Sequence, residues 1–269
     1  MMRVAQKLTL WAFDIDGTLW LSNGPIARET IERLKPRVHV GICSGRADAW
    51  DIAQRLGLGF GMTGKADCLR SFERIWCKPC IGKIYVGDTD LDMNEARKAG
   101  WNFVNVNDFK LNLGCGQDIR FGYVNVDVRP LPGVDLVLDL ETEPLPFQDN
   151  LATEVLAYDV LEHISWRRIV FVLREIHRVL KPGGVLRARL PDVERAFRKG
   201  VAGECPPGVD RLLCLSFLLG GGQDYPENVH KSFFTAELFT ELLTRLGFEV
   251  LELWFDDSNM VVTARKRPR

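Results

Sequence analysis

The stretch Leu111-Asn112-Leu113-Gly114-Cys115-Gly116 ends a short apolar run in a glycine-rich turn. Glycine at the carboxyl end of a parallel strand lets the backbone approach a bound nucleotide closely. Two further apolar runs follow and end in carboxylates, at 123–127 and 134–139. The first carboxylate, Asp127, is placed to bind a ribose diol, and Asp139 to meet an adenine. This pattern predicts a nucleotide-like cofactor at one edge of a parallel sheet.

Outward from this turn, short apolar runs alternate with amphipathic stretches along the whole chain, which is typical of α/β proteins. The runs form two series, separated only by 107–109. We therefore expect two tandem Rossmann-like domains, over 1–108 and 109–269, each a mostly parallel sheet flanked by helices.

The two series predict individual elements. The first predicts strands at 8–13, 38–43, 83–86 and 103–106, with helices at 26–34, 47–56, 66–75 and 92–99. The second predicts strands at 110–113, 123–126, 135–138, 154–157, 185–190, 249–254 and 260–264, with helices at 168–180 and 236–246. An irregular stretch at 192–232 is expected to cover the acceptor site.

The second series resembles class I S-adenosyl-L-methionine-dependent methyltransferases over about 110–264. Besides the turn, the resemblance rests on Asp159-Val160-Leu161-Glu162-His163, Leu180-Lys181-Pro182-Gly183-Gly184 and Leu246-Gly247-Phe248. It implies S-adenosyl-L-methionine as cofactor, bound by Leu113, Gly114, Cys115, Gly116, Asp127, Asp139, Leu140, Tyr158 and Asp159.

Three features depart from that family's pattern. The usual third glycine is absent, Asn112 stands where the family often has an acid, and the interval after the turn is too short for a full helix. A dinucleotide-binding dehydrogenase is the structural rival, but it would need a G-x-G-x-x-G turn that opens a helix. His163 and His230 are alternatives as acceptor-binding groups, although a lone histidine is more often structural.

Toward the N-terminus, Phe13-Asp14-Ile15-Asp16-Gly17-Thr18-Leu19 follows another apolar run. Two carboxylates two residues apart at a strand end can face one pocket, where one attacks phosphorus and the other exchanges a proton. Downstream, a second apolar run ends in Ser44, Lys65 opens a helix, and a third run ends in 87–92, which is rich in aspartate.

These four motifs, in this order, resemble the haloacid-dehalogenase (HAD) phosphohydrolases over 8–106. The resemblance implies an aspartyl-phosphate mechanism, with catalytic residues Asp14, Asp16, Ser44 and Lys65. It also implies Mg²⁺, held by Asp14, Asp16, Asp88 and Asp92, a hard cation that suits oxygen ligands. The intervals between the motifs leave no room for a cap domain. Taken singly, each residue could instead cap a turn or a helix, and Lys78 and Lys83 compete with Lys65.

Composition limits the function classes. The chain has 269 residues, a net charge of −1 and 46% hydrophobic residues, and so lacks the strong positive field typical of nucleic-acid binding. No run approaches the roughly 18 apolar residues needed to cross a membrane. Seven scattered cysteines without an export signal predict reduced thiols and a cytoplasmic protein. The Cys77-Lys-Pro-Cys80 motif is expected to be coincidental, with a metal or redox role as the alternative.

The sequence thus predicts a bifunctional enzyme, a phosphoric monoester hydrolase and a methyltransferase, with a small-molecule or glycan-like substrate. One alternative is a methyltransferase on a scaffolding HAD domain. Another is a regulatory S-adenosylmethionine-binding module on a phosphatase. Nucleic-acid end processing by the phosphatase is a third alternative, disfavoured by the near-neutral charge.

Overall fold

The computed structural model describes residues 7–76 and 79–268. Contacts between residues group the chain into two compact units. Unit 1 contains 7–139 and 146–153, and unit 2 contains 140–145 and 154–268. The domain boundary expected between 108 and 109 lies inside unit 1 and stays a prediction.

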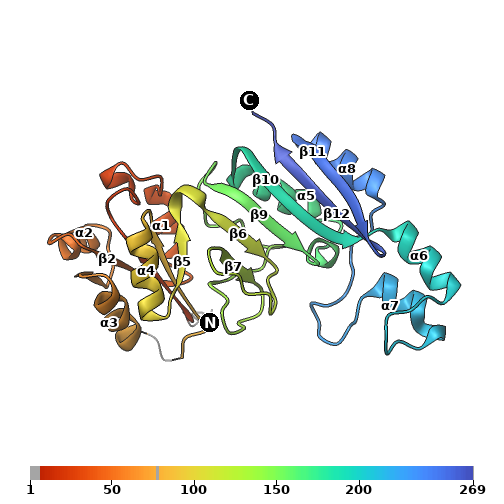
Figure 1. Cartoon of the computed structure of the whole chain (residues 1–269), viewed down its shortest axis with the longest axis horizontal. Helices are drawn as coiled ribbons and strands as arrows, with labels where there is room; N and C mark the ends of the chain where they lie inside the picture. The colour runs from red at the N-terminus through yellow and green to blue at the C-terminus, as the bar shows by residue number, and fades with distance from the viewer. Residues whose placement is uncertain (1–6, 77–78, 269) are drawn as a thin grey trace. The chain divides into compact units, whose positions relative to one another are not determined.

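The first sheet of unit 1 is entirely parallel, with strand order β3-β2-β1-β4-β5 (Figure 1). Its strands are β1 Thr9–Phe13, β2 His39–Ser44, β3 Gly61–Thr63, β4 Gly82–Gly87 and β5 Asn102–Asn105. The helices between them are α1 Arg28–Leu34, α2 Ala49–Arg55, α3 Ala66–Trp76 and α4 Asp90–Ala99, with short turns of 3₁₀ helix at Trp20–Ser22 and Val106–Asp108. Every residue of the central strand β1 is buried, as its apolar sequence predicts.

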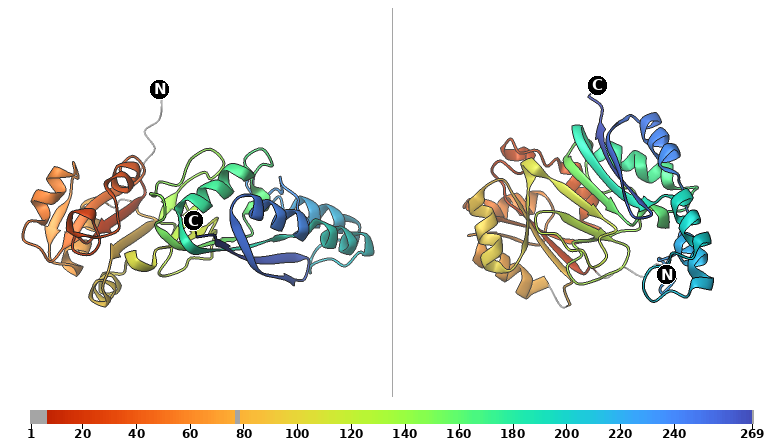
Figure 2. Two further views of the ribbon diagram at one scale, coloured as in Figure 1. Left: turned by 90° about the horizontal axis from the view of Figure 1, so that it is seen from above. Right: turned by 45° about the vertical axis from the view of Figure 1, so that its right-hand side comes forward.

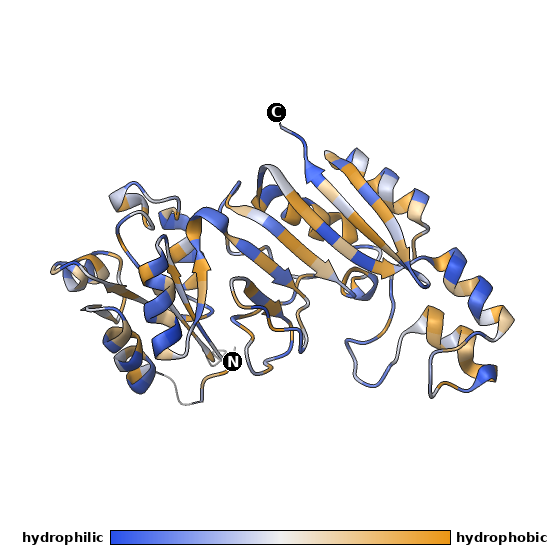
Figure 3. Cartoon of the chain, in the orientation of Figure 1, coloured by the Kyte–Doolittle hydropathy of each residue, from blue (hydrophilic) through white to orange (hydrophobic). Residues whose placement is uncertain are grey.

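Local sequence explains where α4 begins and ends. The Thr89 side chain accepts a hydrogen bond from the Asp92 amide and the Asp92 carboxylate accepts one from the Thr89 amide, which is a capping box. The helix ends at Gly100, whose φ of 72° is left-handed. Figure 3 shows α4 as largely hydrophilic. Its buried residues are Asp92 and Ala96.

Unit 1 also contains three strands of the second sheet, β6 Lys110–Leu113, β7 Val124–Asp127 and β8 Leu136–Val137. They pair in parallel, and no helix lies between β6 and β7 in this fully described interval, as its length predicts. The loop before β8 packs closely on the first sheet. The Trp11 indole donates a hydrogen bond to the Asp135 carbonyl at 2.8 Å, and the Gly133 amide donates one to the Ile81 carbonyl at 2.6 Å. A side chain at Gly82 would overlap the Val134 carbonyl oxygen, so this contact requires glycine.

The remaining strands of the chain are β9 Ala152–Tyr158, β10 Leu180–Pro191, β11 Phe248–Asp256 and β12 Asn259–Lys266. Within unit 2, β12 pairs antiparallel with both β10 and β11. The helices of unit 2 are α5 Ile169–Val179, α6 Val193–Ala202, α7 Cys214–Gly220 and α8 Ala236–Arg245, with 3₁₀ turns at Leu161–His163 and Arg211–Leu213.

The prediction of an irregular stretch over 192–232 is wrong, because α6 and α7 occupy much of it and pack on each other (Figure 2). The Asp192 side chain caps α6 by accepting from the Arg195 amide. The other expected strands and helices are present, with bounds shifted by a few residues, and the short strand β3 was not expected.

The cysteines differ from the expected reduced state. Disulfides join Cys43 to Cys68 and Cys205 to Cys214, whereas Cys115 is free and buried. The Cys77-Cys80 motif, which was expected to be coincidental, lies partly outside the described residues. Among the residues that are described, no helix combines the length and apolarity needed to span a membrane.

Candidate functional site

The polar motifs of the first sheet meet at its carboxyl edge. Asp14 follows β1, Ser44 ends β2 and Asp88 follows β4. Since β1 lies between β2 and β4 in a parallel sheet, these ends are neighbours. Carboxylate oxygens of Asp14, Asp88 and Asp92 lie within 4.8 Å of one another.

Asp14 lies at the centre of this group and is 4% exposed. Burial raises the pKa of its carboxyl group, while a hydrogen bond from Ser44 and the charge of Lys65 act to lower it. The Lys65 ammonium lies 3.7 Å from Asp14 Oδ2. The other oxygen, Oδ1, has no hydrogen-bond partner among the described residues. A buried carboxylate oxygen in this state favours an additional cation or donor.

Asp92 is fully buried and holds Lys65 in place through a close ion pair. Burial alone would raise the pKa of Asp92, but the hydrogen bonds from Lys65 and Thr89 outweigh it and the pKa is lowered. Burial likewise opposes the charge of Lys65, yet the bond to Asp92 and the nearby Asp14 raise its pKa overall. The pair is therefore charged, and Asp92 positions Lys65 beside Asp14.

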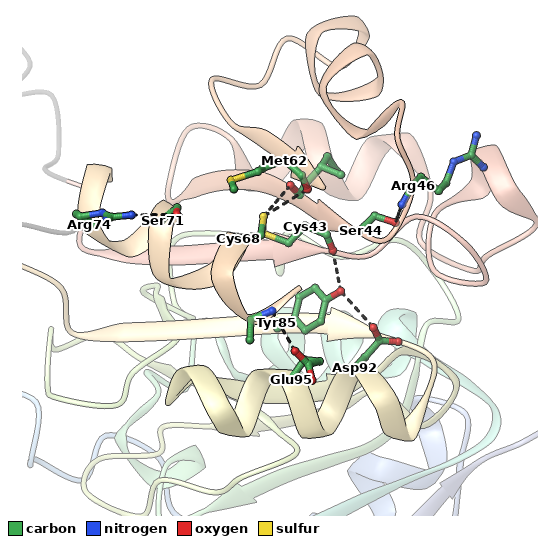
Figure 4. The surroundings of a disulfide bond; sticks show 12 residues. Cys43, Ser44, Arg46, Met62, Cys68, Ser71, Arg74, Tyr85, Asp92 and Glu95 are labelled. Atoms are coloured by element: carbon green, nitrogen blue, oxygen red, sulfur yellow. Dashed lines mark hydrogen bonds between the residues drawn. A yellow bond between two sulfur atoms is a disulfide. The ribbon is translucent and has the colours of Figure 1, made fainter. Parts of the chain in front are cut away.

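Tyr85 connects this edge to the disulfide. Its hydroxyl lies 2.7 Å from the Cys43 carbonyl oxygen and 3.2 Å from Asp92 Oδ1, as Figure 4 shows. The Cys43–Cys68 bond joins β2, which ends in Ser44, to α3, which begins just after Lys65. The sequence offered no local signal for Tyr85, because β4 reads simply as a buried apolar strand.

Asp16 has a different environment, with a side chain that is 63% exposed. It accepts hydrogen bonds from Ser22 at 2.6 Å and from Arg46 at 3.0 Å, and these lower the pKa of its carboxyl group, the Ser22 bond most strongly. Gly17 adopts a φ of 65°, and a side chain there would overlap Asp88. Asp16 is thus brought near Arg46, a residue that sequence reasoning missed although it lies two positions after Ser44.

The glycine turn after β6 forms a second site. Gly114 and Gly116 have φ values of 61° and 51°, which strongly favour glycine. Asp127 ends the neighbouring strand β7 and is 6% exposed. Its Oδ2 accepts from the Gly116 amide and its Oδ1 from the Arg129 amide, both at 2.8 Å. The carboxylate therefore fixes the shape of the turn.

The other residues expected to bind the cofactor are divided between the units. Unit 1 contains buried Leu113 and Cys115 and half-buried Asp139. Burial raises the pKa of the Cys115 thiol to about 12, so it stays protonated. Unit 2 contains buried Leu140, half-buried Tyr158 and exposed Asp159.

Asp159 has an unusual backbone for a non-glycine residue, with a φ of 53° directly after β9. Its amide donates to the Arg189 carbonyl at 2.9 Å, and its carboxylate forms an ion pair with the Arg189 guanidinium. Strained backbone of this kind often occurs at functional sites.

Comparison with known proteins bears on the second motif set. Residues 111–188 match a family described as a methyltransferase domain. No curated protein matches the chain. The matched segment contains the glycine turn, Asp127, Asp139 and the β9–β10 region.

Several solved methyltransferases are also similar to this chain. A Burkholderia thailandensis 1,6-didemethyltoxoflavin-N1-methyltransferase, solved with S-adenosylhomocysteine, has 15% identity and a TM-score of 0.40 over 64% of this chain and 75% of its own. A Thermotoga maritima possible histamine N-methyltransferase has 16% identity and a TM-score of 0.35 over 69% and 73%. A Mesorhizobium loti S-adenosylmethionine-dependent methyltransferase has 14% identity and a TM-score of 0.35 over 98% and 93%. These TM-scores are too low to bear on function.

Proposed function

We propose that this protein transfers the methyl group of S-adenosyl-L-methionine to a small-molecule or glycan-like acceptor. The observation that carries the proposal is the glycine turn tied to Asp127 inside the methyltransferase domain. The residues fit the cofactor, because Gly114 and Gly116 present backbone without side chains beside a nearly buried carboxylate.

In this mechanism the chain's residues bind and orient. Asp127 retains lone pairs beyond its two amide bonds, and these accept hydrogen bonds from the ribose hydroxyls. Asp139, which lies shortly after β8, would contact the adenine. When bound, S-adenosyl-L-methionine supplies an electrophilic methyl group on a positively charged sulfur. Catalysis then requires an acceptor held in line with that group.

Calorimetric titration of S-adenosyl-L-methionine and S-adenosylhomocysteine tests this proposal. Asp127→Ala removes both amide contacts and the ribose acceptor, so we expect binding to weaken about 100-fold or more. Asp118→Ala is the matched control, because it removes a carboxylate of the same turn that is 59% exposed and pairs with Arg120. Absence of binding to the unaltered protein, or equal binding by both variants, would refute the proposal.

We also propose that a HAD-like domain over 1–108 hydrolyses phosphate monoesters. A specific observation favours this second function: Asp14, Asp88 and Asp92 converge, and one buried oxygen of Asp14 lacks a partner among the described residues. Three carboxylates are a suitable donor set for Mg²⁺. Asp14 and Asp88, with the Asp16 backbone carbonyl, would hold this ion, and it would offset negative charge on a phosphoryl group.

In this reaction Asp14 acts as the nucleophile and Asp16 as the general acid and base. Asp14 attacks phosphorus and becomes an aspartyl phosphate, while the leaving alcohol takes a proton from Asp16. Water subsequently hydrolyses the acyl phosphate, with Asp16 accepting its proton. Ser44 and Lys65 lie beside Asp14 and stabilise the transferring phosphoryl group.

Release of phosphate from a panel of phosphomonoesters, with and without Mg²⁺, tests this activity. Asp14→Asn should abolish turnover, and Asp90→Asn should not, because Asp90 is an exposed carboxylate at the start of α4. Turnover that survives in Asp14→Asn would refute the nucleophile. No turnover by the unaltered chain, together with intact cofactor binding, would favour a methyltransferase with a scaffolding first domain.

A further inference from the structure

A third polar cluster lies in unit 2, outside both sites above. Glu162 and His163 belong to the 3₁₀ turn Leu161–His163 that follows β9, and His230 precedes α8. One carboxylate oxygen and one ring nitrogen from each histidine lie within 4.8 Å of one another. The two imidazole rings are 5.1 Å apart between centroids.

Backbone hydrogen bonds hold the two segments of this cluster together. The amides of Lys231 and Ser232 both donate to the Glu162 carbonyl, at 2.7 and 3.1 Å. The Ser232 hydroxyl donates to the Ile164 carbonyl at 2.6 Å in a buried position. His230 is therefore fixed opposite Glu162 by main-chain contacts on its carboxyl-terminal side, so the arrangement of side chains is preorganised.

The environment of the Glu162 carboxylate favours a bound cation or hydrogen-bond donor. Glu162 is 3% exposed, and its Oε2 has no hydrogen-bond partner among the residues that the structure describes. Leaving such an oxygen buried and unpaired is costly unless a cation or donor satisfies it. The charge of Arg189 acts on Glu162, but the Arg189 guanidinium is already ion-paired with Asp159.

The histidines supply ring nitrogens that can bind a metal beside this carboxylate. His163 Nδ1 lies 3.1 Å from the Val229 carbonyl oxygen, which favours a proton on Nδ1. In the tautomer that donates from Nδ1 to this carbonyl, Nε2 carries the lone pair that can bind a metal. A carbonyl behind a histidine ring is the usual outer partner of a metal-binding histidine.

We propose that Glu162, His163 and His230 bind a divalent transition-metal ion. Two imidazoles and one carboxylate suit zinc, manganese, iron or cobalt, whereas magnesium and calcium prefer oxygen ligands alone. The site thus differs in chemistry from the all-carboxylate group around Asp14. Three protein ligands leave coordination positions for water or for an oxygen atom of a bound molecule.

Metal titration of the chelator-treated full chain tests the proposal. We expect one Zn²⁺ to bind per chain by calorimetry, and Co²⁺ to give visible absorption bands when it binds the same site. Glu162→Gln and His230→Gln should each weaken binding by about 100-fold or more. Glu227→Gln is the charge-matched control, because Glu227 is an exposed carboxylate near His230 that is not a ligand.

A second control separates this site from the candidate magnesium site. Asp14→Asn should leave Zn²⁺ binding and the Co²⁺ spectrum unchanged. Circular dichroism and thermal unfolding identify any variant that fails to fold, and two independent ligand variants keep the test decisive. The proposal is overturned if the unaltered chain binds no Zn²⁺, or if the folded ligand variants bind it as tightly as Glu227→Gln does.

Discussion

Replacing Asp135 by asparagine tests whether the buried carboxyl group of Asp135 makes the free energy of unfolding depend on pH. Asp135 is 1% exposed, and its Oδ2 accepts hydrogen bonds from Asn102 Nδ2 at 2.8 Å and from Asn125 N and Nδ2 at 3.0 and 2.9 Å. Burial nevertheless raises the pKa of Asp135 to about 7. These bonds connect β5 of the first sheet with β7 and with the loop before β8.

The raised pKa sets the sign of a pH dependence. An aspartate in an unfolded chain has a pKa of about 4, so the unfolded state releases its proton at lower pH than the folded state. The contribution to stability is fully present below about pH 4 and is lost as pH rises through about 7. Three pKa units correspond to about 4 kcal/mol, of which about 3 kcal/mol is lost between pH 5 and pH 8.

Asp135→Asn keeps an oxygen for the three donors and removes the ionisation. The free energy of unfolding of this variant, relative to the unaltered chain, should therefore increase by about 3 kcal/mol from pH 5 to pH 8. Urea unfolding at four pH values measures the difference, with exposed Asp90→Asn as the control. Parallel pH profiles for Asp135→Asn and the unaltered chain would show that Asp135 is charged in the folded state and would refute the reasoning.

Three further outcomes are expected. Cys68→Ser removes the disulfide to Cys43, which joins residues with a sequence separation of 25. Urea unfolding without reductant should show that the free energy of unfolding falls by about 3 kcal/mol. Equal free energies of unfolding would contradict the pairing with Cys43. Tyr85→Phe removes a buried bond to the Cys43 carbonyl and should lower the free energy of unfolding by about 1 to 2 kcal/mol, measured by the same method. Ser22→Ala removes the hydrogen bond that lowers the pKa of Asp16 most strongly. The limb of the phosphatase pH profile that reports Asp16 should therefore move to higher pH. Superimposable profiles would exclude Asp16 as the acid.

Local patterns were enough to predict most strands and helices, because each buried strand is a short apolar run next to a turn. The turn with Gly114 and Gly116 was predictable for the same reason, since two left-handed positions need glycine. The helices α6 and α7 lie in the stretch that was expected to be irregular and were not predicted. Asp192, which caps α6, was the available signal.

Contacts between distant side chains could not be predicted. The ion pair of Lys65 with Asp92 joins the start of α3 to the first turn of α4, and nothing local to either residue specifies the other. The same holds for Glu162 and His230, which only the folded backbone of unit 2 brings together. A histidine that looks solitary in sequence can thus belong to a cluster.

The close packing of the loop before β8 on the first sheet limits how this chain can be dissected. A fragment that ends at 108 would expose the Trp11 indole and the glycine surface at Gly82, both of which are covered by 133–135. The complementary fragment would lose the Asn102 partner of Asp135. Recombination that exchanged either half alone would create an exposed, poorly paired surface, so the two segments are constrained to be inherited as one piece.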